Sequence, residues 1–144
     1  MSGNRNTVDD IMKKYKVDID KAVANNKYLN ARLIASVIRK ESKGNKNAYN
    51  FVNNAPHQGL MQLSPAAISD INAMGVNVTD PFNASQNIAG GSKYLEHLIE
   101  LYKGDRAKGL AAYNFGQGNI KHNRPLPNET RDYVSSISRM AGNQ

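Results

Sequence analysis

The chain has no cysteine among its 144 residues. This absence excludes disulfide bonds, a thiol nucleophile and thiolate metal ligands. It does not indicate a compartment, because a chain without cysteine is equally compatible with oxidising and reducing surroundings.

Long apolar runs are also absent, so no membrane-spanning segment is expected. The polar start of the chain, Met1–Asn6, is not followed by an apolar stretch, and therefore no secretory signal peptide is predicted. The three histidines, His57, His97 and His122, lack metal-ligand spacing, and we expect neither a metal nor an organic cofactor. A length of 144 residues with 40% hydrophobic residues predicts a single globular domain, 1–144.

The positive charge is concentrated near the start of the chain. Residues 1–46 carry eleven Lys and Arg against five acidic residues, whereas residues 47–144 carry eight against seven. Such a basic segment predicts an anionic partner, which could be nucleic acid, a membrane surface or an acidic polymer. No nucleic-acid-binding motif accompanies it, so nucleic acid is not expected, and an anionic cell-wall polymer fits the charge.

Apolar spacing and capping residues predict a mainly α-helical fold. In the long helix expected after Asp80-Pro81, Ile88, Gly91, Leu95, Leu98 and Leu101 stand at helical spacing. In the last helix Thr130, Val134 and Ile137 are expected inward, with Tyr133 beside them. The Asn- and Gly-rich residues 44–63 are expected to form at most a small β-hairpin or an irregular flap. The expected helices cover residues 7–15, 18–25, 31–42, 64–75, 82–104, 105–114 and 128–141.

Glu41 extends the apolar stripe that Leu33 and Val37 form along the helix 31–42. Burial raises the pKa of a carboxyl group, and the negative end of a helix dipole acts in the same direction. Both effects favour a protonated Glu41 near neutral pH, as a general acid requires. The alternative is a glutamate that turns into solvent at the end of the helix.

Three segments of the chain together resemble the soluble lytic transglycosylase domain, a relative of goose-type lysozyme. The resemblance extends over residues 28–138 and leaves residues 1–27 as a basic, helical N-terminal segment. The three segments are Glu41-Ser42, Gly59-Leu60-Met61-Gln62-Leu63-Ser64-Pro65 and Ala111-Ala112-Tyr113-Asn114-Phe115-Gly116. Further similar positions are Asp80-Pro81, Asn87-Ile88, Gly90, Tyr94-Leu95, Glu129-Thr130 and Tyr133-Val134.

The resemblance implies a mainly α, lysozyme-like domain that cleaves the β-1,4 bond between N-acetylmuramic acid and N-acetylglucosamine in peptidoglycan. Such an enzyme forms a 1,6-anhydro-muramoyl end without consuming water. One carboxyl group can serve, since Glu41 first protonates the leaving oxygen and then accepts the proton of the sugar's 6-hydroxyl. Most glycosidases use two carboxyl groups, whereas only Glu41 lies in a motif of this kind.

The resemblance also implies which residues contact the glycan. Glu41 is the expected catalytic residue, and Met61 with Gln62 would line the floor of the groove. The expected substrate-binding residues are Ser42, Asn50, Met61, Gln62, Tyr113, Asn114, Glu129 and Tyr133. Met61 could equally be a core residue, and Ser42 is expected to support the helix end. The chain departs from the family at Asn50, where a serine is usual, and at residues 55–58, where a small Gly-Ala stretch is usual.

Two other functions remain open from the sequence. A true muramidase on the same fold would need a second carboxylate, such as Asp70 or Asp80, facing the cleft. A catalytically silent glycan-binding module would have no use for the acid. The missing signal peptide favours a bacteriophage-encoded lysis or virion-associated lysin that is made in the cytoplasm and acts on the cell wall. The alternatives are a component of a conjugation or secretion apparatus and a chain that lacks its leader. A monomer is expected.

Overall fold

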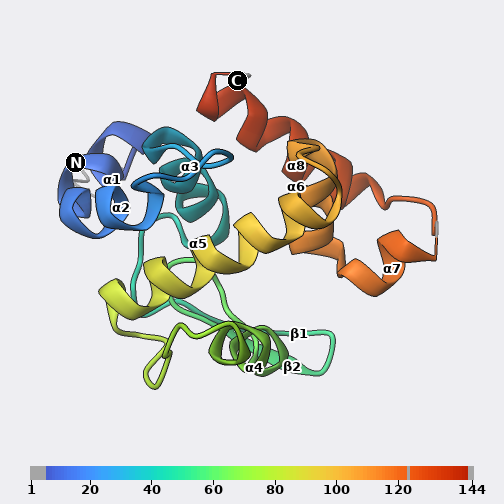
Figure 1. Cartoon of the computed structure of the whole chain (residues 1–144), viewed down its shortest axis with the longest axis horizontal. Helices are drawn as coiled ribbons and strands as arrows, with labels where there is room; N and C mark the ends of the chain where they lie inside the picture. Colours follow the sequence, from blue (N-terminus) through green and yellow to red (C-terminus); the bar gives the residue numbers. More distant parts are fainter. Residues whose placement is uncertain (1–5, 123, 143–144) are drawn as a thin grey trace.

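The structure, a computed structural model, describes residues 6–122 and 124–142, and this part of the chain is mainly helical (Figure 1). The predicted mainly α fold with a small β-hairpin between residues 44 and 63 is confirmed. The helices are α1 (Val8–Lys14), α2 (Lys16–Val23), α3 (Ala31–Ser42), α4 (Pro65–Ala73), α5 (Ala84–Leu101), α6 (Arg106–Phe115), α7 (Gln117–Lys121) and α8 (Asn128–Ala141). Strands β1 (Tyr49–Val52) and β2 (Ala55–Gln58) form an antiparallel pair in which Asn50 is opposite His57.

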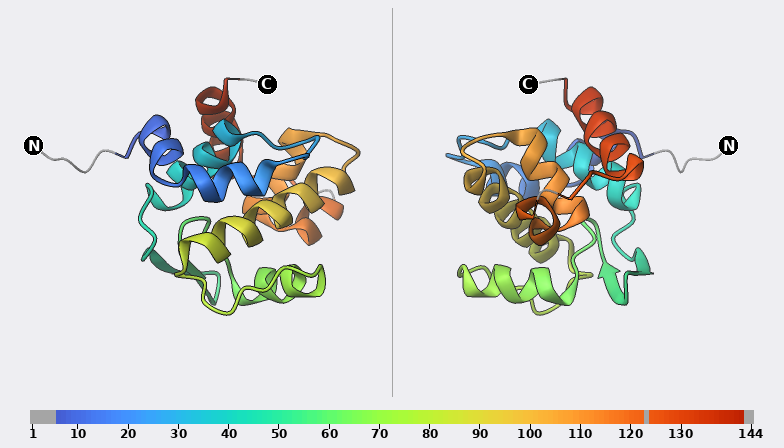
Figure 2. Two further views of the ribbon diagram at one scale, coloured as in Figure 1. Left: turned by 60° about the vertical axis from the view of Figure 1, so that its left-hand side comes forward. Right: turned by 90° about the vertical axis from the view of Figure 1, so that its right-hand side faces the viewer.

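Helix α3 lies at the centre of the fold and is covered on several sides. Its residues Leu33–Ile38 are buried, and it packs against α1, α2 and α8. The long helix α5 packs against α2, α4 and α6. Figures 1 and 2 show α1–α3 on one side of α5, and α4 with the hairpin on the other. The chain therefore forms two lobes that share α5.

Local sequence signals define the ends of α1 and α3 as predicted. Thr7 and Asp10 form a capping box, since each side chain accepts a hydrogen bond from the other residue's backbone N–H. The Asn30 side chain accepts the N–H of Leu33 and begins α3. The helix ends at Ser42 because Lys43 adopts a left-handed conformation with φ of 57°.

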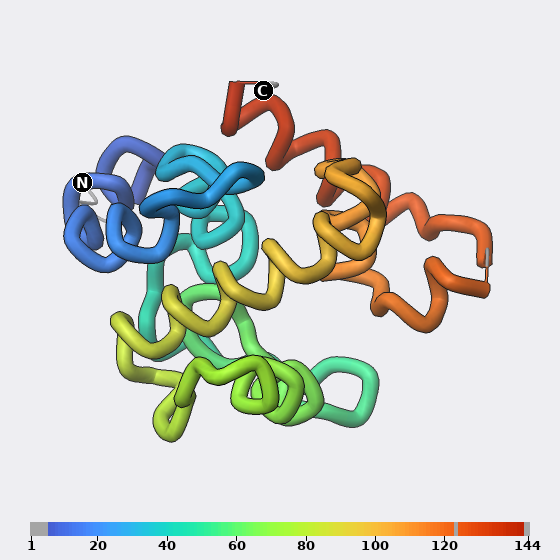
Figure 3. The backbone as a smooth tube through the Cα atoms, viewed as in Figure 1, coloured from blue at the N-terminus to red at the C-terminus, as the bar shows by residue number. Residues whose placement is uncertain are grey.

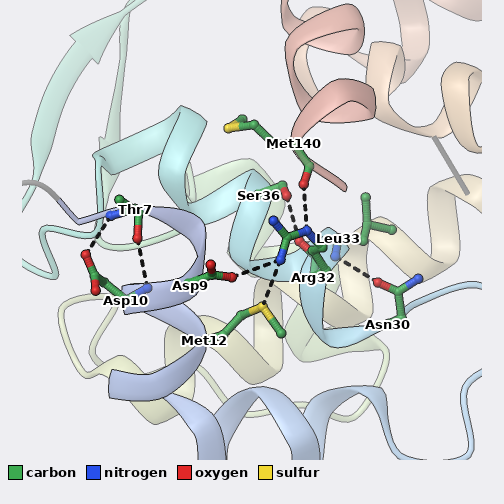
Figure 4. Close-up of polar contacts among 9 residues, drawn as sticks. All are labelled: Thr7, Asp9, Asp10, Met12, Asn30, Arg32, Leu33, Ser36 and Met140. Atoms are coloured by element: carbon green, nitrogen blue, oxygen red, sulfur yellow. Dashed lines mark hydrogen bonds and ion pairs between the residues drawn. The ribbon is translucent and has the colours of Figure 1, made fainter. Parts of the chain in front are cut away.

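Arg32 joins three helices at the edge of the core (Figure 4). Its Nη1 donates to Asp9 Oδ1 of α1 at 2.9 Å, and its Nε donates to the carbonyl of Met140 in α8 at 3.0 Å. Arg32 itself lies in the first turn of α3. The contacts hold the first and last helices of the structure against the helix that carries Glu41.

Asn87 of α5 links the segment after the hairpin to this helix through buried hydrogen bonds. Its side chain is fully buried, accepts the N–H of Met61 at 2.8 Å, and donates to the carbonyls of Gln58 at 3.0 Å and Pro81 at 2.8 Å. Gly59 packs against it in a left-handed conformation with φ of 82°, and a Cβ there would lie 2.2 Å from the Pro81 carbonyl oxygen. Only glycine fits this close approach.

Several predicted details were wrong. Leu101, expected inward on α5, is 51% exposed. On α8 Val134, predicted inward, is only partly buried, whereas Tyr133, predicted beside the inward residues, is buried. Helix α7 was not predicted, and Figure 3 shows this helix, in orange, set away from the body of the molecule. In the described ranges, no helix combines the length and apolar composition needed to cross a bilayer.

Candidate active site

Glu41 lies in the last turn of α3, where it is half-buried and paired with a tyrosine from α8. The Tyr133 hydroxyl donates a hydrogen bond of 2.6 Å to Glu41 Oε2. Tyr133 is itself only 3% exposed, so this bond is made in surroundings of low polarity. The predicted acid is therefore oriented by a residue 92 positions later in the chain.

Burial raises the pKa of Glu41 from its ordinary value of 4.5 to about 7. The hydrogen bond from Tyr133 and the charge of Lys40 act in the opposite direction, because both stabilise the carboxylate. Desolvation outweighs them. A carboxyl group with this pKa is divided between its acid and base forms near neutral pH, which suits a group that must donate and then accept a proton.

Tyr113 interacts both with Glu41 and with the segment that follows the hairpin. Its hydroxyl donates to the backbone carbonyl of Met61 at 2.7 Å, and its ring packs against Tyr94 of α5 with 5.7 Å between centroids. Burial raises the pKa of Tyr113 well above its ordinary value, and the negative charge of Glu41 adds to the effect. Tyr113 thus remains a neutral hydrogen-bond donor near the acid.

Gln62 holds the base of the hairpin with all of its side-chain groups. Its Nε2 donates to the carbonyls of Ala48 at 3.2 Å and Gly59 at 3.0 Å, and its Oε1 accepts from Asn50 Nδ2 at 2.9 Å. Gln62 is a non-glycine residue with a positive φ of 55°, a strained conformation that the bonds to the loop maintain. Asn50 therefore lies beside Gln62 on the hairpin.

Asn114 is held by a residue that the sequence analysis did not assign to the site. Thr130 Oγ1 of α8 donates to Asn114 Oδ1 at 2.8 Å, and Thr130 is 2% exposed. This leaves the Asn114 amide nitrogen without a partner among the hydrogen bonds of residues 6–122 and 124–142. The bond joins the ends of α6 and α8 next to the cleft.

A cleft of about 260 Å³ opens beside these groups. It contains three of the predicted substrate-binding residues, Gln62, Tyr113 and Asn114. Its other lining residues are Asn53, His57, Leu63, Ser64, Ala66, Ala67, Tyr94, Ala112, Phe115 and Gly116. Glu41 is not among these lining residues; it is connected to them through Tyr113, whose pKa its charge raises.

Ser42, Met61 and Glu129 are not among the residues that line the cleft. The Ser42 hydroxyl donates to the carbonyl of Ile38 at 3.1 Å and accepts the N–H of Gly44, so it serves the end of α3. The Met61 side chain is fully buried against Gly91, where an added Cβ would lie 2.5 Å from Met61 Sδ. The Met61 backbone carbonyl accepts the hydrogen bond of Tyr113. Glu129 is exposed in the first turn of α8 and takes no part in the hydrogen bonds around Glu41.

The residues that line the cleft in the described ranges include no carboxyl group. Asp70 and Asp80, the two candidates for a hydrolytic base, are exposed, and Asp80 caps a turn by accepting the N–H of Phe82. No cluster of three or more potential metal ligands occurs in residues 6–122 and 124–142.

Sequence reasoning missed Thr130, Tyr94 and Asn87 as supports of the site, although all three lie at positions similar to the family. Tyr94 packs on Tyr113 and lines the cleft, while Asn87 holds the backbone of Met61. Buried polar residues within apolar stripes were the available signal, because such residues need hydrogen-bond partners.

Known proteins resemble this chain in sequence. The family model of the transglycosylase SLT domain matches residues 18–134. A transglycosylase of Enterobacteria phage PRD1 is 31% identical over 115 residues, which cover 80% of this chain and 40% of that protein. The membrane-bound lytic murein transglycosylase F of Alteromonas mediterranea is 33% identical over 104 residues, 68% of this chain and 21% of that protein.

Solved structures share the fold at lower identity. The lytic transglycosylase Slt of Pseudomonas aeruginosa, an inactive Glu-to-Gln mutant, superposes with a TM-score of 0.78 at 23% identity, over 92% of this chain and 24% of that one. The 70 kDa soluble lytic transglycosylase of Escherichia coli gives a TM-score of 0.76 at 20% identity, over 92% of this chain and 25% of that one. The chain thus spans less than half the length of these relatives. Its match to the family model and to the phage protein shows that it belongs to the transglycosylase SLT domain family.

Proposed function

We propose that this chain is a peptidoglycan lytic transglycosylase in which Glu41 is the only catalytic carboxyl group. The observation that carries the proposal is a half-buried glutamate, with a pKa of about 7 and a tyrosine hydrogen bond, next to a cleft whose described lining has no other acid. The relatives named transglycosylase and lytic murein transglycosylase support the same substrate and reaction.

In the proposed reaction the protonated Glu41 donates its proton to the glycosidic oxygen between N-acetylmuramic acid and N-acetylglucosamine. The bond from this oxygen to C1 breaks as positive charge develops on the muramic acid ring. The 6-hydroxyl oxygen of the same sugar then bonds to C1, and the Glu41 carboxylate accepts the hydroxyl proton. The products are a 1,6-anhydro-muramoyl end and a free N-acetylglucosamine 4-hydroxyl, and Glu41 returns to its starting form.

The surrounding residues take supporting roles in this proposal. Tyr133 stabilises the Glu41 carboxylate between its two proton transfers. Asn114 has its oxygen fixed by Thr130, and its amide nitrogen is free among the described contacts to donate to the 2-acetamido group of the sugar. Gln62 and Asn50 shape the cleft wall, because their side chains are bound to each other and to the loop.

The place of action proposed is the bacterial cell wall, with the chain acting as a monomer. The relative from phage PRD1 favours a phage lysis or virion enzyme over a component of a conjugation or secretion apparatus. The basic residues 1–46 would promote attachment to the anionic wall.

The first test is mass spectrometry of the muropeptides released from purified peptidoglycan by the wild-type chain and by Glu41→Gln. We expect products that carry 1,6-anhydro ends and are lighter by one water than hydrolysis products, and we expect none of them from the variant. Asp70→Asn is the matched control, because Asp70 is exposed outside the cleft lining, and it should release the same products as wild type. Reducing-end muramic acid would mean hydrolysis, and binding without any release would mean a silent module.

A further inference from the structure

A second cavity, of about 450 Å³, lies between α6, α7 and α8 and shares no lining residue with the cleft. These helices lie together on one side of the molecule (Figure 1), and α6 packs against both of the others. The apolar part of the lining is Ala107 and Ala111 of α6, Ile120 of α7, Leu126 of the segment that follows α7, and Val134 of α8. The cavity therefore has an apolar floor.

The core uses these apolar side chains only in part. Ala111 is buried, whereas Ile120 and Leu126 are partly buried and lie outside the hydrophobic core of the described residues. Val134 packs against the core but is also only partly buried. Apolar surface in a concave site favours an apolar ligand, because binding removes that surface from water.

Three cations stand around the apolar floor, namely Lys108 of α6, Arg124 and Arg131 of α8. The one carboxylate in the lining, Asp105, accepts the N–H of Lys108 at 3.0 Å and so caps α6. None of the three cations forms an ion pair within residues 6–122 and 124–142. Arg131 Nη2 donates to the neutral Asn128 Oδ1 at 3.1 Å. The cavity thus carries excess positive charge, which favours an anion.

Backbone hydrogen bonds hold both arginines at the cavity. The N–H of Arg124 donates to the carbonyl of Asn119 in α7 at 3.1 Å, so the segment after α7 folds back toward that helix. The N–H of Arg131 donates to the carbonyl of Pro127 at 3.1 Å at the start of α8. The neighbouring Thr130 ties this turn to α6 through its bond to Asn114. The two guanidinium groups therefore come from separately anchored segments.

The floor and the cations together indicate an amphiphile with an anionic head. A guanidinium group matches the oxygens of a phosphate or carboxylate and can bind them in a bidentate manner. The apolar floor requires an alkyl group attached to that anion. The volume of 450 Å³ suits a small ligand, whereas the apolar face of a protein helix needs a long groove. A single alkyl chain is slender enough for this cavity.

We propose that this cavity binds an anionic amphiphile, with its alkyl chain on Ile120, Leu126 and Val134 and its phosphate head at Arg124 and Arg131. The inference goes beyond peptidoglycan cleavage and does not depend on it. A soluble alkyl phosphate and a membrane phospholipid share this chemistry. Because the cavity and the cleft have no lining residue in common, the cleft would stay accessible with the ligand bound.

The test is titration of the full chain with octyl phosphate below its micellar concentration, followed by isothermal calorimetry and amide chemical shifts. We expect shifts at Ile120, Arg124 and Val134. Octyl glucoside lacks the anion and inorganic phosphate lacks the chain, so each should bind at least about tenfold more weakly. Hexyl phosphate should bind severalfold more weakly than octyl phosphate, because the cavity buries fewer methylene groups.

Variants separate the head from the chain. For Arg124→Gln/Arg131→Gln we expect a Kd for octyl phosphate at least about tenfold higher, because two charge-assisted contacts are lost. Lys13→Gln/Lys46→Gln is the matched control, with the same charge change on exposed lysines outside the cavity, and its Kd should stay within twofold of wild type. Leu126→Ser should raise the Kd severalfold. Unchanged melting temperatures of the free variants would show that binding, and not folding, was lost.

Flotation with phosphatidylglycerol vesicles distinguishes the two sources of the ligand. Vesicle binding that the arginine double variant loses and the lysine control keeps would identify a membrane lipid, whereas octyl phosphate binding without vesicle binding would identify a soluble amphiphile. The site would be overturned by equal weakening in both double variants, or by octyl glucoside or inorganic phosphate binding as tightly as octyl phosphate. Tighter binding of an acidic amphipathic peptide of leucine and glutamate would replace the amphiphile with a protein partner and also overturn it.

Discussion

Two opposing effects act on the Glu41 carboxyl group. Burial disfavours its charged form, whereas the hydrogen bond from Tyr133 favours it. Since the first step requires the acid form and the pKa is about 7, kcat/KM for peptidoglycan cleavage should fall above pH 7, by about tenfold per pH unit. Initial rates of muropeptide release between pH 5 and pH 9 measure this limb. A profile that stays flat through pH 9 would contradict Glu41 as the acid.

Tyr133→Phe should move the same limb in a predictable direction. The Tyr133 hydrogen bond lowers the pKa of Glu41, so its removal raises that pKa and shifts the alkaline limb to higher pH. A limb that stays in place in this variant would contradict the Tyr133 hydrogen bond as a determinant of the Glu41 pKa.

The raised pKa of Glu41 also makes stability depend on pH. Because the folded chain keeps a proton that the unfolded chain releases, Glu41 favours folding below pH 4.5, and this contribution is lost as pH rises to about 7. Above pH 7 the charged carboxylate should cost on the order of 3 kcal/mol, so Glu41→Gln should be more stable than wild type at pH 8 and similar at pH 4. Urea denaturation at both pH values measures the difference, and a variant less stable at pH 8 would refute it.

Single residues were predictable when the local sequence determined their chemistry. Glu41 was found because it extends the stripe of Leu33 and Val37, both of which are fully buried. The hydrogen bonds of Gln62 were not predictable, because they depend on a loop conformation with positive φ. The roles of all eight predicted binding residues toward a substrate remain predictions.

At the scale of elements, the hairpin lobe depends on its attachment to α5. Asn87→Ala would leave the Met61 N–H and the carbonyls of Gln58 and Pro81 without their buried partner. We expect a loss of about 2–4 kcal/mol in the free energy of unfolding. Asn77→Ala is the control, since Asn77 is exposed, and chemical denaturation compares the two. Equal effects at both positions would contradict a specific role for Asn87.

Element boundaries followed from caps, whereas helix faces did not always follow from spacing. Thr7, Asn30 and Ser64 each begin a helix as expected, because their side chains bond locally. On α8 both Tyr133 and Val134 lie at helical spacing from Ile137, and only the packing against α3 and α6 determines which one is inside. Helix α7 has two glycines at its start, Gly116 and Gly118, so its local sequence gave a weak helical signal.

At the scale of the whole molecule, net charge should govern attachment to the wall. With a formal charge of +7, binding of the inactive Glu41→Gln chain to insoluble peptidoglycan should weaken severalfold between 50 and 500 mM NaCl. Cosedimentation with purified peptidoglycan measures the bound fraction. Binding that does not change with salt would assign attachment to uncharged sugar contacts.

The Glu41–Tyr133 pair also has a consequence for the order of events during biosynthesis. The acid is translated 92 residues before the tyrosine that orients it, and α8 must emerge from the ribosome and dock on α3 before the two meet. A nascent chain that has already formed α3 therefore carries its acid without its hydrogen-bond donor. Activity should begin only after α8 has docked on α3. Wall cleavage is therefore delayed until α8 has been synthesised.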